Sequence, residues 1–388
     1  MSRRNVLALI GIFFASLVLR PPVAAVGPLI PEITGKLGLS ASQVGILTAI
    51  PVLCFGIGAF AGPAIVRRIG LDRTLFLLLG LIVASIALRA WFGYPSLLVG
   101  TTVVGLAIAV ANVILPSIVR DRFPKQIALI TAGYTLVLSI SASGAASIAV
   151  PVSSFLGGWQ FSLIIWVVPA ALGFLVWSTQ IREPFNPLPA EHHKAESRSV
   201  LRSPITWALV VFFGFQSLGF YALLGWLPSL LIDRGLTPDA AGALLGLSTI
   251  VGVPTGITLA ANLGRFKSLV IPAVITSSIT LTGMVLLLTP YSVLAVVVIG
   301  FGQAATFPIS LNLISTRATT AAQTTSLSAI SQGVGYILAA LGTFAFGWLR
   351  DLTGEWTAPI VLLIALTLVQ VLSGALVGRP KKIENPVT

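Results

Sequence analysis

The chain has 388 residues, of which 56% are hydrophobic and only 9% are charged, whereas a soluble domain carries about 25% charged residues. This composition excludes a soluble enzyme or binding module and indicates a protein that crosses a membrane several times. The net charge of +12 could suggest a nucleic-acid partner, but the sequence has no motif of that kind, and the placement of the charges explains the excess.

The first apolar stretch, Val6 to Ile33, contains Arg20 followed directly by Pro21 and Pro22. It is too long for a signal peptide, so we expect the first transmembrane helix here. A charge near the centre of a bilayer costs between about 3 and more than 10 kcal/mol, depending on the method. The prolines interrupt helical hydrogen bonds, and backbone groups freed at that depth persist only in a cavity or inside protein. We therefore expect a polar site within the membrane.

A membrane-spanning helix needs about 20 apolar residues, and the sequence contains twelve such segments. They divide six and six about a polar, proline-rich stretch. We expect an all-α membrane protein with a first half over 1–181, a central loop over 182–203 and a second half over 204–388. The expected spans are 5–30, 42–65, 74–92, 97–118, 127–150, 160–181, 205–231, 240–262, 268–289, 292–314, 323–348 and 357–377.

The lysines and arginines divide unequally between the two sides of this arrangement. Of the 23, eighteen fall on the side of the amino terminus, three on the other side, and Arg20 and Arg89 within spans. Cytoplasmic loops carry the excess of basic residues. We therefore expect both termini and the central loop in the cytoplasm of a bacterial plasma membrane protein, with the bilayer rather than a nucleic acid as the partner of the basic charge.

The two halves share an internal repeat. The segment Gly38 to Gly45 after the first span matches Gly235 to Gly242 after the seventh, at a shift of 197 residues. Within these segments Ser40 and Thr237 are suitable N-caps for the helices that follow. Gly62 and Gly70 recur as Gly256 and Gly264, and basic residues follow each pair.

Two six-helix halves in parallel repeat, joined by a long cytoplasmic loop, resemble the major facilitator superfamily. The loop after the second span departs from the family's usual Gly-x-x-x-Asp-Arg-x-Gly-Arg-Arg pattern, because Val66 stands where the Asp would be. Other segments resemble the cyanate permease and 2-nitroimidazole exporter branch: Leu19-Arg20-Pro21, Asn112 to Pro116, Gly225 to Pro228 and Gly333 to Tyr336. This resemblance implies a secondary transporter of small, planar, polar or anionic solutes.

Candidate binding residues in the first half are Arg20, Arg89 and Asn112. Arg20 either pairs with carbonyls freed by the adjacent prolines or donates to an anionic, carbonyl or nitro oxygen of the solute. Arg89, near the outer end of the third span, either extends to the membrane surface or acts as a second donor or outer gate. Asn112 either joins helices or hydrogen-bonds the solute.

In the second half, Gln216, Tyr221 and Trp226 of the seventh span are candidates because the resemblance implies that spans 1, 4, 7 and 10 line the cavity. Tyr221 could stack on a flat solute, whereas Trp226 could instead belong to the aromatic belt at the membrane surface. Gln303 and Gln332 complete the candidate set.

All eleven acidic residues lie outside the spans, although proton-driven carriers commonly use a buried carboxylate. We therefore expect proton coupling to be weak or carried by the solute, unless Glu32 reaches the cavity. An inside-negative potential drives a free anion out of the cell, with a free-energy difference of about 2.3 kcal/mol per charge per 100 mV.

Other classes of function lack the residues they need. The two histidines, His192 and His193, and the single cysteine, Cys54, supply no catalytic or metal-ligating cluster within the membrane. No Gly-x-x-x-x-Gly-Lys loop indicates a nucleotide-driven pump. We expect no enzyme activity, no cofactor and no metal, and a monomer that binds a small-molecule substrate.

Overall fold

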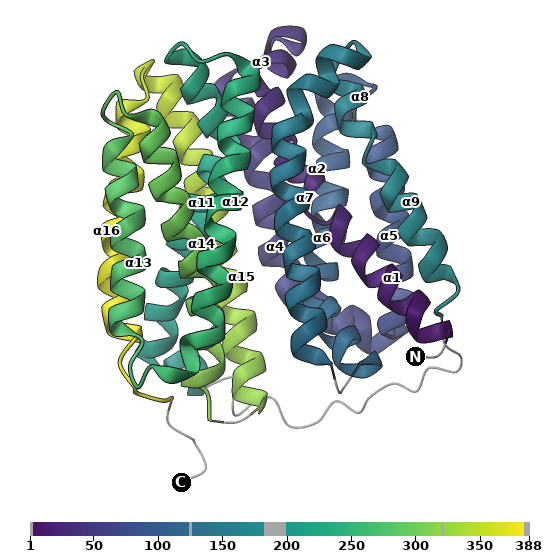
Figure 1. The fold of residues 1–388 in the computed structure, drawn as a ribbon, viewed down its shortest axis with the longest axis vertical. Helices are drawn as coiled ribbons and strands as arrows, with labels where there is room; N and C mark the ends of the chain where they lie inside the picture. The colour runs from purple at the N-terminus through teal and green to yellow at the C-terminus, as the bar shows by residue number, and fades with distance from the viewer. Residues whose placement is uncertain (1–2, 124–125, 182–198, 320, 384–388) are drawn as a thin grey trace. The chain divides into compact units, whose positions relative to one another are not determined.

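The computed structural model describes residues 3–123, 126–181, 199–319 and 321–383, and these are helical with no strand among them (Figure 1). The chain forms two compact units. The first unit contains Met1–Pro189 and Leu227–Gly246, and the second contains Ala190–Trp226 and Leu247–Thr388. The expected halves 1–181 and 204–388 stay a prediction, and most of the expected loop 182–203 lies outside the described residues.

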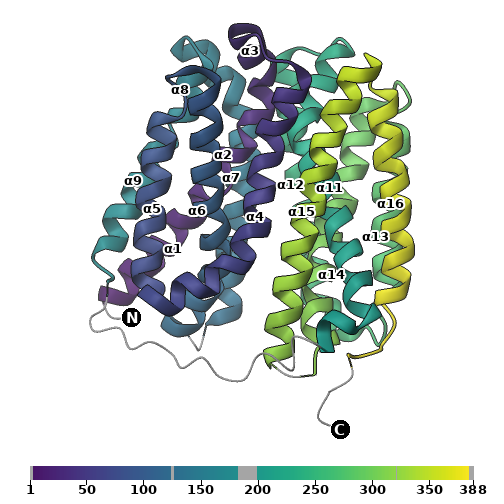
Figure 2. The same cartoon turned by 180° about the vertical axis from the view of Figure 1, so that it is seen from behind.

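Among the described residues, eleven helices are long and apolar enough to cross a membrane, and one shorter apolar helix, α13, accompanies them. The expectation of an all-α, twelve-span protein is confirmed. Helices α11 and α12 contribute residues to both units. The helices (Figures 1 and 2) are α1 (Arg3–Val18), α2 (Pro21–Ala24), α3 (Val26–Leu37), α4 (Ala41–Ile69), α5 (Leu71–Leu88), α6 (Gly93–Arg122), α7 (Ile127–Leu156), α8 (Trp159–Ile164), α9 (Val167–Ser178), α11 (Pro204–Asp233), α12 (Pro238–Asn262), α13 (Val270–Leu286), α14 (Ser292–Arg317), α15 (Ala321–Thr353) and α16 (Thr357–Val377), with a short 3-10 helix at Leu263–Arg265.

The first expected span, 5–30, is interrupted where the sequence predicts it. Helix α1 ends at Val18, and Arg20 precedes the short α2 with φ −112° and ψ −42°. Pro21 and Pro22 have no N–H to donate, so the ladder of α1 cannot continue through them. The Arg20 carbonyl instead accepts from the N–H groups of Val23 and Ala24, at 3.1 and 3.0 Å. The expected span therefore contains α1, α2 and the start of α3 rather than one continuous helix.

Both expected N-caps are present. The Ser40 hydroxyl accepts from the N–H of Gln43 at 3.2 Å, and the Gln43 side chain accepts from the N–H of Ser40 at 2.9 Å. This reciprocal pair starts α4. At the equivalent place in the repeat, the Thr237 hydroxyl accepts from the N–H of Ala240 at 3.3 Å and starts α12.

Small residues allow the helices of the first unit to pack closely. Helix α6 contacts α4 and α5. A Cβ atom at Gly58 of α4 would lie 2.4 Å from the Cβ of Ala109 on α6, so only glycine fits at this distance. Gly105 also lies at a close helix contact, because a Cβ there would meet Cys54 at 3.2 Å, whereas nothing lies within 4 Å of a Cβ at Gly144.

A buried polar clamp holds one end of the first unit. The Arg122 guanidinium donates to Asp72 Oδ2 at 2.7 Å and to the Gln180 carbonyl at 3.0 Å. The Trp177 indole donates to the Asp72 carbonyl at 3.0 Å. The clamp joins the start of α5, the end of α6 and the end of α9. Position 66 is a valine, and the carboxylate that pairs with Arg122 belongs to Asp72.

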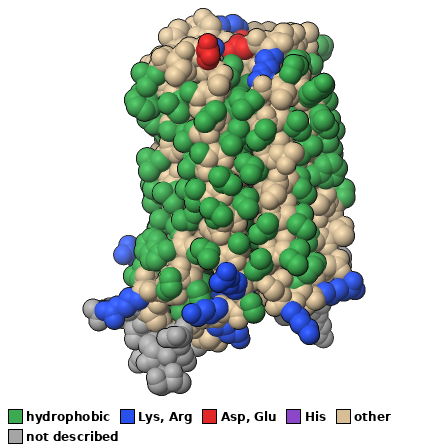
Figure 3. All heavy atoms as spheres, turned by 90° about the vertical axis from the view of Figure 1, so that its left-hand side faces the viewer, with side chains coloured by type: hydrophobic (Ala, Val, Ile, Leu, Met, Phe, Trp, Pro, Cys, Tyr) green, Lys and Arg blue, Asp and Glu red, His purple; other side chains and the backbone are tan. Residues whose placement is uncertain are grey.

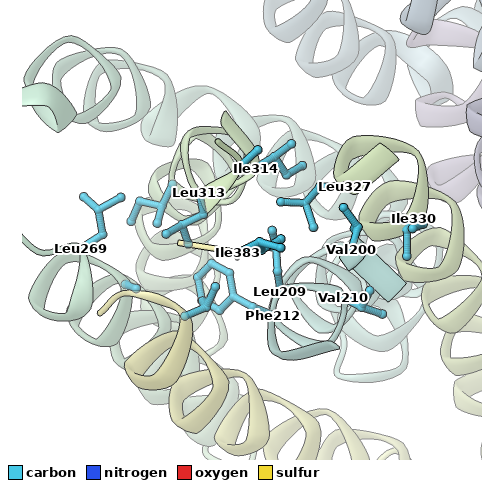
Figure 4. Close-up of a cluster of buried hydrophobic side chains, with 14 of the residues drawn as sticks. Val200, Leu209, Val210, Phe212, Leu269, Leu313, Ile314, Leu327, Ile330 and Ile383 are labelled. Carbon is cyan, nitrogen blue, oxygen red and sulfur yellow. The ribbon is translucent and has the colours of Figure 1, made fainter. Parts of the chain in front are cut away.

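The second unit has an apolar core between α11, α14 and α15, in which Leu209, Phe212, Leu313 and Leu327 are fully buried (Figure 4). Helix α13 packs on α14 and α16. Arg317 ends α14 and donates to the carbonyls of residues 377 and 378 at 2.9 and 3.0 Å. A cation at a helix C-terminus stabilises the helix dipole, so Arg317 fixes the end of α16.

One face of the second unit is covered by hydrophobic side chains over its middle, with lysines and arginines at its lower edge (Figure 3). On α13 and α16 the large apolar residues Ile271 and Leu372 are 67% and 60% exposed. Apolar side chains exposed along whole helices match a lipid environment. The chain is a multi-pass membrane protein.

Candidate functional site

The first unit brings two of the predicted arginines to one place, the break between α1 and α2. Arg20 lies in the break and its side chain is partly exposed. Arg89 follows the last residue of α5, and its Nη1 donates to the carbonyl of Pro22 at 2.9 Å. The sequence predicts both arginines as site residues, but it does not indicate the contact with the Pro22 carbonyl, which is 67 positions from Arg89.

Arg89 does not extend to the membrane surface, so that alternative is wrong. The residue is only 1% exposed. Its Nε and Nη2 atoms are buried and have no hydrogen-bond partner among the described residues. A buried polar group without a partner is destabilising, and a buried charge is more so. The guanidinium therefore retains donors that the described part of the protein does not use.

Asn112 lies within α6 and is partly exposed. No hydrogen bond from its side chain to another described residue is present. A residue that joins two helices would hydrogen-bond across them, so this alternative has no support from the geometry. The amide is chemically able to donate to and accept from a solute.

In the second unit, two predicted residues meet. Gln216 on α11 donates through Nε2 to Oε1 of Gln303 on α14 at 3.3 Å. If the Gln303 amide is rotated by 180°, it donates to the Gln216 carbonyl at 3.2 Å and accepts from the N–H of Phe220 at 3.3 Å. Both glutamines are buried, at 3% and 6% exposed. In either orientation the pair joins α11 to α14.

Tyr221 belongs to an aromatic cluster that sequence reasoning found only in part. Its ring lies 6.3 Å from Tyr336 on α15 and 5.1 Å from Phe220, both edge to face. Tyr336 in turn lies 5.0 Å from Phe213. The segment Gly333 to Tyr336 carries part of the family resemblance, but nothing in the sequence indicates a contact between Tyr336 and α11. Gln332 on the same helix is partly exposed and donates within α15 to Ser328 at 2.7 Å.

Trp226 is not a membrane-surface tryptophan, so that alternative is also wrong. It is 3% exposed and packs against Phe346 and Trp356, with ring centroids 6.4 and 6.1 Å away. Arg350 lies over the Trp356 ring at 4.9 Å. The Trp226 Nε1 is buried without a hydrogen-bond partner among the described residues. Trp226 is therefore part of an aromatic cluster inside the second unit.

Glu32 is the carboxylate that the sequence leaves as a candidate for proton coupling. In the structure three hydrogen-bond donors fix it. It accepts from the Ser153 hydroxyl, from the N–H of Trp159 at 3.1 Å and from Lys36 at 3.0 Å. Burial alone would raise the pKa of Glu32, but the hydrogen bonds from Ser153, Lys36 and Trp159 outweigh it and lower that pKa below its ordinary value of 4.5. Glu32 therefore remains ionised near neutral pH and joins α3 to α7 and α8.

Comparison with known proteins agrees with this architecture. Residues 9–343 match the family described as Major Facilitator Superfamily. The chain is 33% identical to the uncharacterised transporter YycB of Bacillus subtilis (strain 168), covering 96% of this chain and 94% of that protein. It is 32% identical to the 2-nitroimidazole transporter of Escherichia coli (strain K12), over 99% and 98% of the two chains.

The cyanate transport protein CynX of Escherichia coli (strain K12) is 28% identical over 94% of this chain and 95% of that protein. Among solved structures, that of a D-xylose-proton symporter superposes with a TM-score of 0.75 at 14% identity, covering 98% and 97% of the two chains. These matches are transporters, so the expectation that the chain is not an enzyme is confirmed.

Proposed function

Because the chain belongs to the major facilitator superfamily, in the branch of the 2-nitroimidazole and cyanate transporters, we propose that it moves a small planar solute, polar or anionic, across the membrane. Arg20 donates to an oxygen of this solute. Transport follows the alternating-access scheme, in which a site near the middle of the membrane opens to one side and then to the other.

The observation that carries the proposal is a guanidinium at an interrupted helix within an apolar span. Arg20 lies between α1 and α2, in the apolar segment Arg4–Ala24, which is long enough to cross a membrane. A charged residue at such a position is costly and marks a solute pathway in many membrane proteins. The planar guanidinium matches carboxylate, nitro or cyanate groups. Arg89 and Asn112 are the further donors that we assign to the first unit.

The second unit has its own aromatic and amide side chains that we assign as candidate solute contacts. We assign Tyr221 and its neighbour Tyr336, whose ring centroids lie 6.3 Å apart, as the aromatic groups that contact a flat heteroaromatic solute. The amides of Gln216, Gln303 and Gln332 and the indole of Trp226 are assigned as secondary contacts. This aromatic cluster favours a nitroimidazole-like solute over cyanate, which has no ring to stack.

We further propose that the protein works as a monomer in the bacterial inner membrane, with both termini in the cytoplasm. The basic excess at the cytoplasmic side supports this orientation. An anion moves outward with an inside-negative potential, whereas uptake requires exchange or a proton carried with the solute. Transport of other small organic acids, or broader efflux, is the second candidate, because the same guanidinium can donate hydrogen bonds to any carboxylate.

The test is transport by purified protein in proteoliposomes. The panel contains 2-nitroimidazole, cyanate, nitrite and small carboxylates, each measured for wild type, Arg20→Gln and the control Arg379→Gln, an exposed arginine outside the spans. We expect wild type and the control to transport at least one panel solute and Arg20→Gln to transport it much more slowly. Equal rates for wild type and Arg20→Gln would remove Arg20 from the mechanism.

A further inference from the structure

Arg89 is held in place more firmly than a lipid-facing arginine would be. Its N–H donates to the Ser85 carbonyl at 3.0 Å, and its carbonyl accepts from the Ser96 hydroxyl at 3.1 Å. Helix α6 passes very close, because a Cβ atom at Gly100 would lie 2.2 Å from the Cβ of Arg89. The backbone and the first side-chain carbon of Arg89 are therefore fixed by the turn between α5 and α6.

The guanidinium is bound on one side only. Nη1 donates to the Pro22 carbonyl at 2.9 Å, and Nε and Nη2 are buried without a partner among the described residues. In a planar guanidinium, the N–H of Nε and one N–H of Nη2 point in the same direction, away from Cδ, and form the two-pronged donor edge that binds carboxylates. The Pro22 carbonyl thus binds only Nη1, and the donor edge formed by Nε and Nη2 has no partner among the described residues.

No carboxylate of the described chain neutralises this group. Lys36 pairs with Glu32, and Arg122 pairs with Asp72 and Asp121, whereas Arg89 forms no ion pair with a described residue. A buried guanidinium with two parallel donors and no fixed counter-charge is complementary to an acceptor that brings two oxygens in one plane.

We infer that the Nε/Nη2 edge of Arg89 binds a planar two-oxygen group, such as the carboxylate, nitro or nitrite group of the transported solute. This inference rests on the proposed function and makes it more specific. A linear anion such as cyanate can use only one of the two donors at a time, and chloride offers no paired oxygens. A tetrahedral dianion would need more donors than this edge supplies. The edge therefore selects solutes by the geometry of their oxygen atoms.

The first experiment is equilibrium binding to the purified full-length protein, with formate and nitrite as two-oxygen probes and cyanate and chloride as comparisons. Arg89→Lys keeps the charge but removes the planar fork. We expect formate and nitrite to bind wild type about tenfold more tightly than chloride or cyanate, and to bind Arg89→Lys about tenfold more weakly than wild type. Equal affinity of wild type for all four anions, or unchanged formate affinity in Arg89→Lys, would overturn the inference.

A second pair of variants decides the question if Arg89→Lys does not fold. Gly100→Ala must displace Arg89, since the new Cβ would overlap its Cβ, whereas Gly144→Ala meets nothing within 4 Å. We expect Gly100→Ala to weaken formate binding several-fold and Gly144→Ala to leave it unchanged. Unchanged formate binding in Gly100→Ala contradicts the inference.

Transport separates this inference from the proposed function. If wild type binds formate through Arg89 but transports no panel solute, the proposed function fails and the anion site stands. If wild type transports a two-oxygen solute and Arg89→Lys does so with the same apparent affinity, the site at Arg89 fails and the proposed function stands.

Discussion

Replacing Glu32 by glutamine separates a structural carboxylate from a proton carrier. In the structure Glu32 accepts from Ser153 and from the N–H of Trp159, and it pairs with Lys36. Glutamine keeps one acceptor oxygen but loses the charge. Two charge-assisted hydrogen bonds become neutral or are lost, at roughly 1 kcal/mol each, and the exposed ion pair with Lys36 adds at most about 1 kcal/mol.

The predicted cost of Glu32→Gln is therefore about 1–3 kcal/mol, which for a chain of this length corresponds to a melting temperature lowered by roughly 1–4 °C. The control Lys36→Gln removes only the exposed ion pair and is expected to cost less than about 1 kcal/mol. Thermal unfolding of the purified variants in detergent measures both differences. A cost for Lys36→Gln as large as that for Glu32→Gln would contradict the assigned hydrogen bonds.

The stabilisation of the fold by Glu32 depends on pH in a defined direction. The pKa of Glu32 is lowered in the folded protein, so its stabilisation is fully present above the ordinary value of 4.5 and is lost as the pH falls through the lower folded-state pKa. Between pH 6 and 8, Glu32→Gln is expected to change neither the pH profile of transport nor its response to a proton gradient. Uptake that an inward proton gradient accelerates in wild type, but not in Glu32→Gln, would refute this account of coupling.

Three further predictions concern packing and solute contacts. Asp72→Asn removes the carboxylate paired with buried Arg122. We expect the free energy of unfolding to fall by about 1–3 kcal/mol, and by no more, because Arg122 keeps its other hydrogen bonds. No change in melting temperature would argue against the clamp. Gly246→Val places a side chain where a Cβ would already lie 2.0 Å from the Ser147 hydroxyl. We therefore expect the free energy of unfolding to fall by about 1–3 kcal/mol and transport to be slower. An unaffected variant would show that α7 and α12 do not need this contact. Tyr221→Leu is expected to weaken binding of 2-nitroimidazole about two- to tenfold while leaving cyanate unchanged, and an equal loss for both solutes would exclude stacking.

The spans and the position of Arg20 could be predicted from the sequence because a single charge in a long apolar run is visible without knowing any contact. The structure confirms the break at Pro21 and Pro22 for the same local reason, since missing N–H groups act on their own helix. These features depend on neighbours within a few residues.

The environment of Arg89 could not be predicted in this way. At the end of a helix, an arginine can reach the membrane surface or turn inward, and the choice depends on Pro22 and Gly100 from other helices. Trp226 is a similar case, because its burial depends on Phe346 and Trp356. Contacts between residues far apart in the chain leave no periodic pattern in one sequence.

Recognition of the solute by Arg20 is measured by equilibrium binding of a transported panel solute to wild type and Arg20→Gln, both shown to be folded by their melting temperatures. A lost hydrogen bond to a charged donor is worth about 1.5–3 kcal/mol, so we predict binding to Arg20→Gln that is roughly ten- to 150-fold weaker. Binding to a folded Arg20→Gln with the affinity of wild type would contradict the claim.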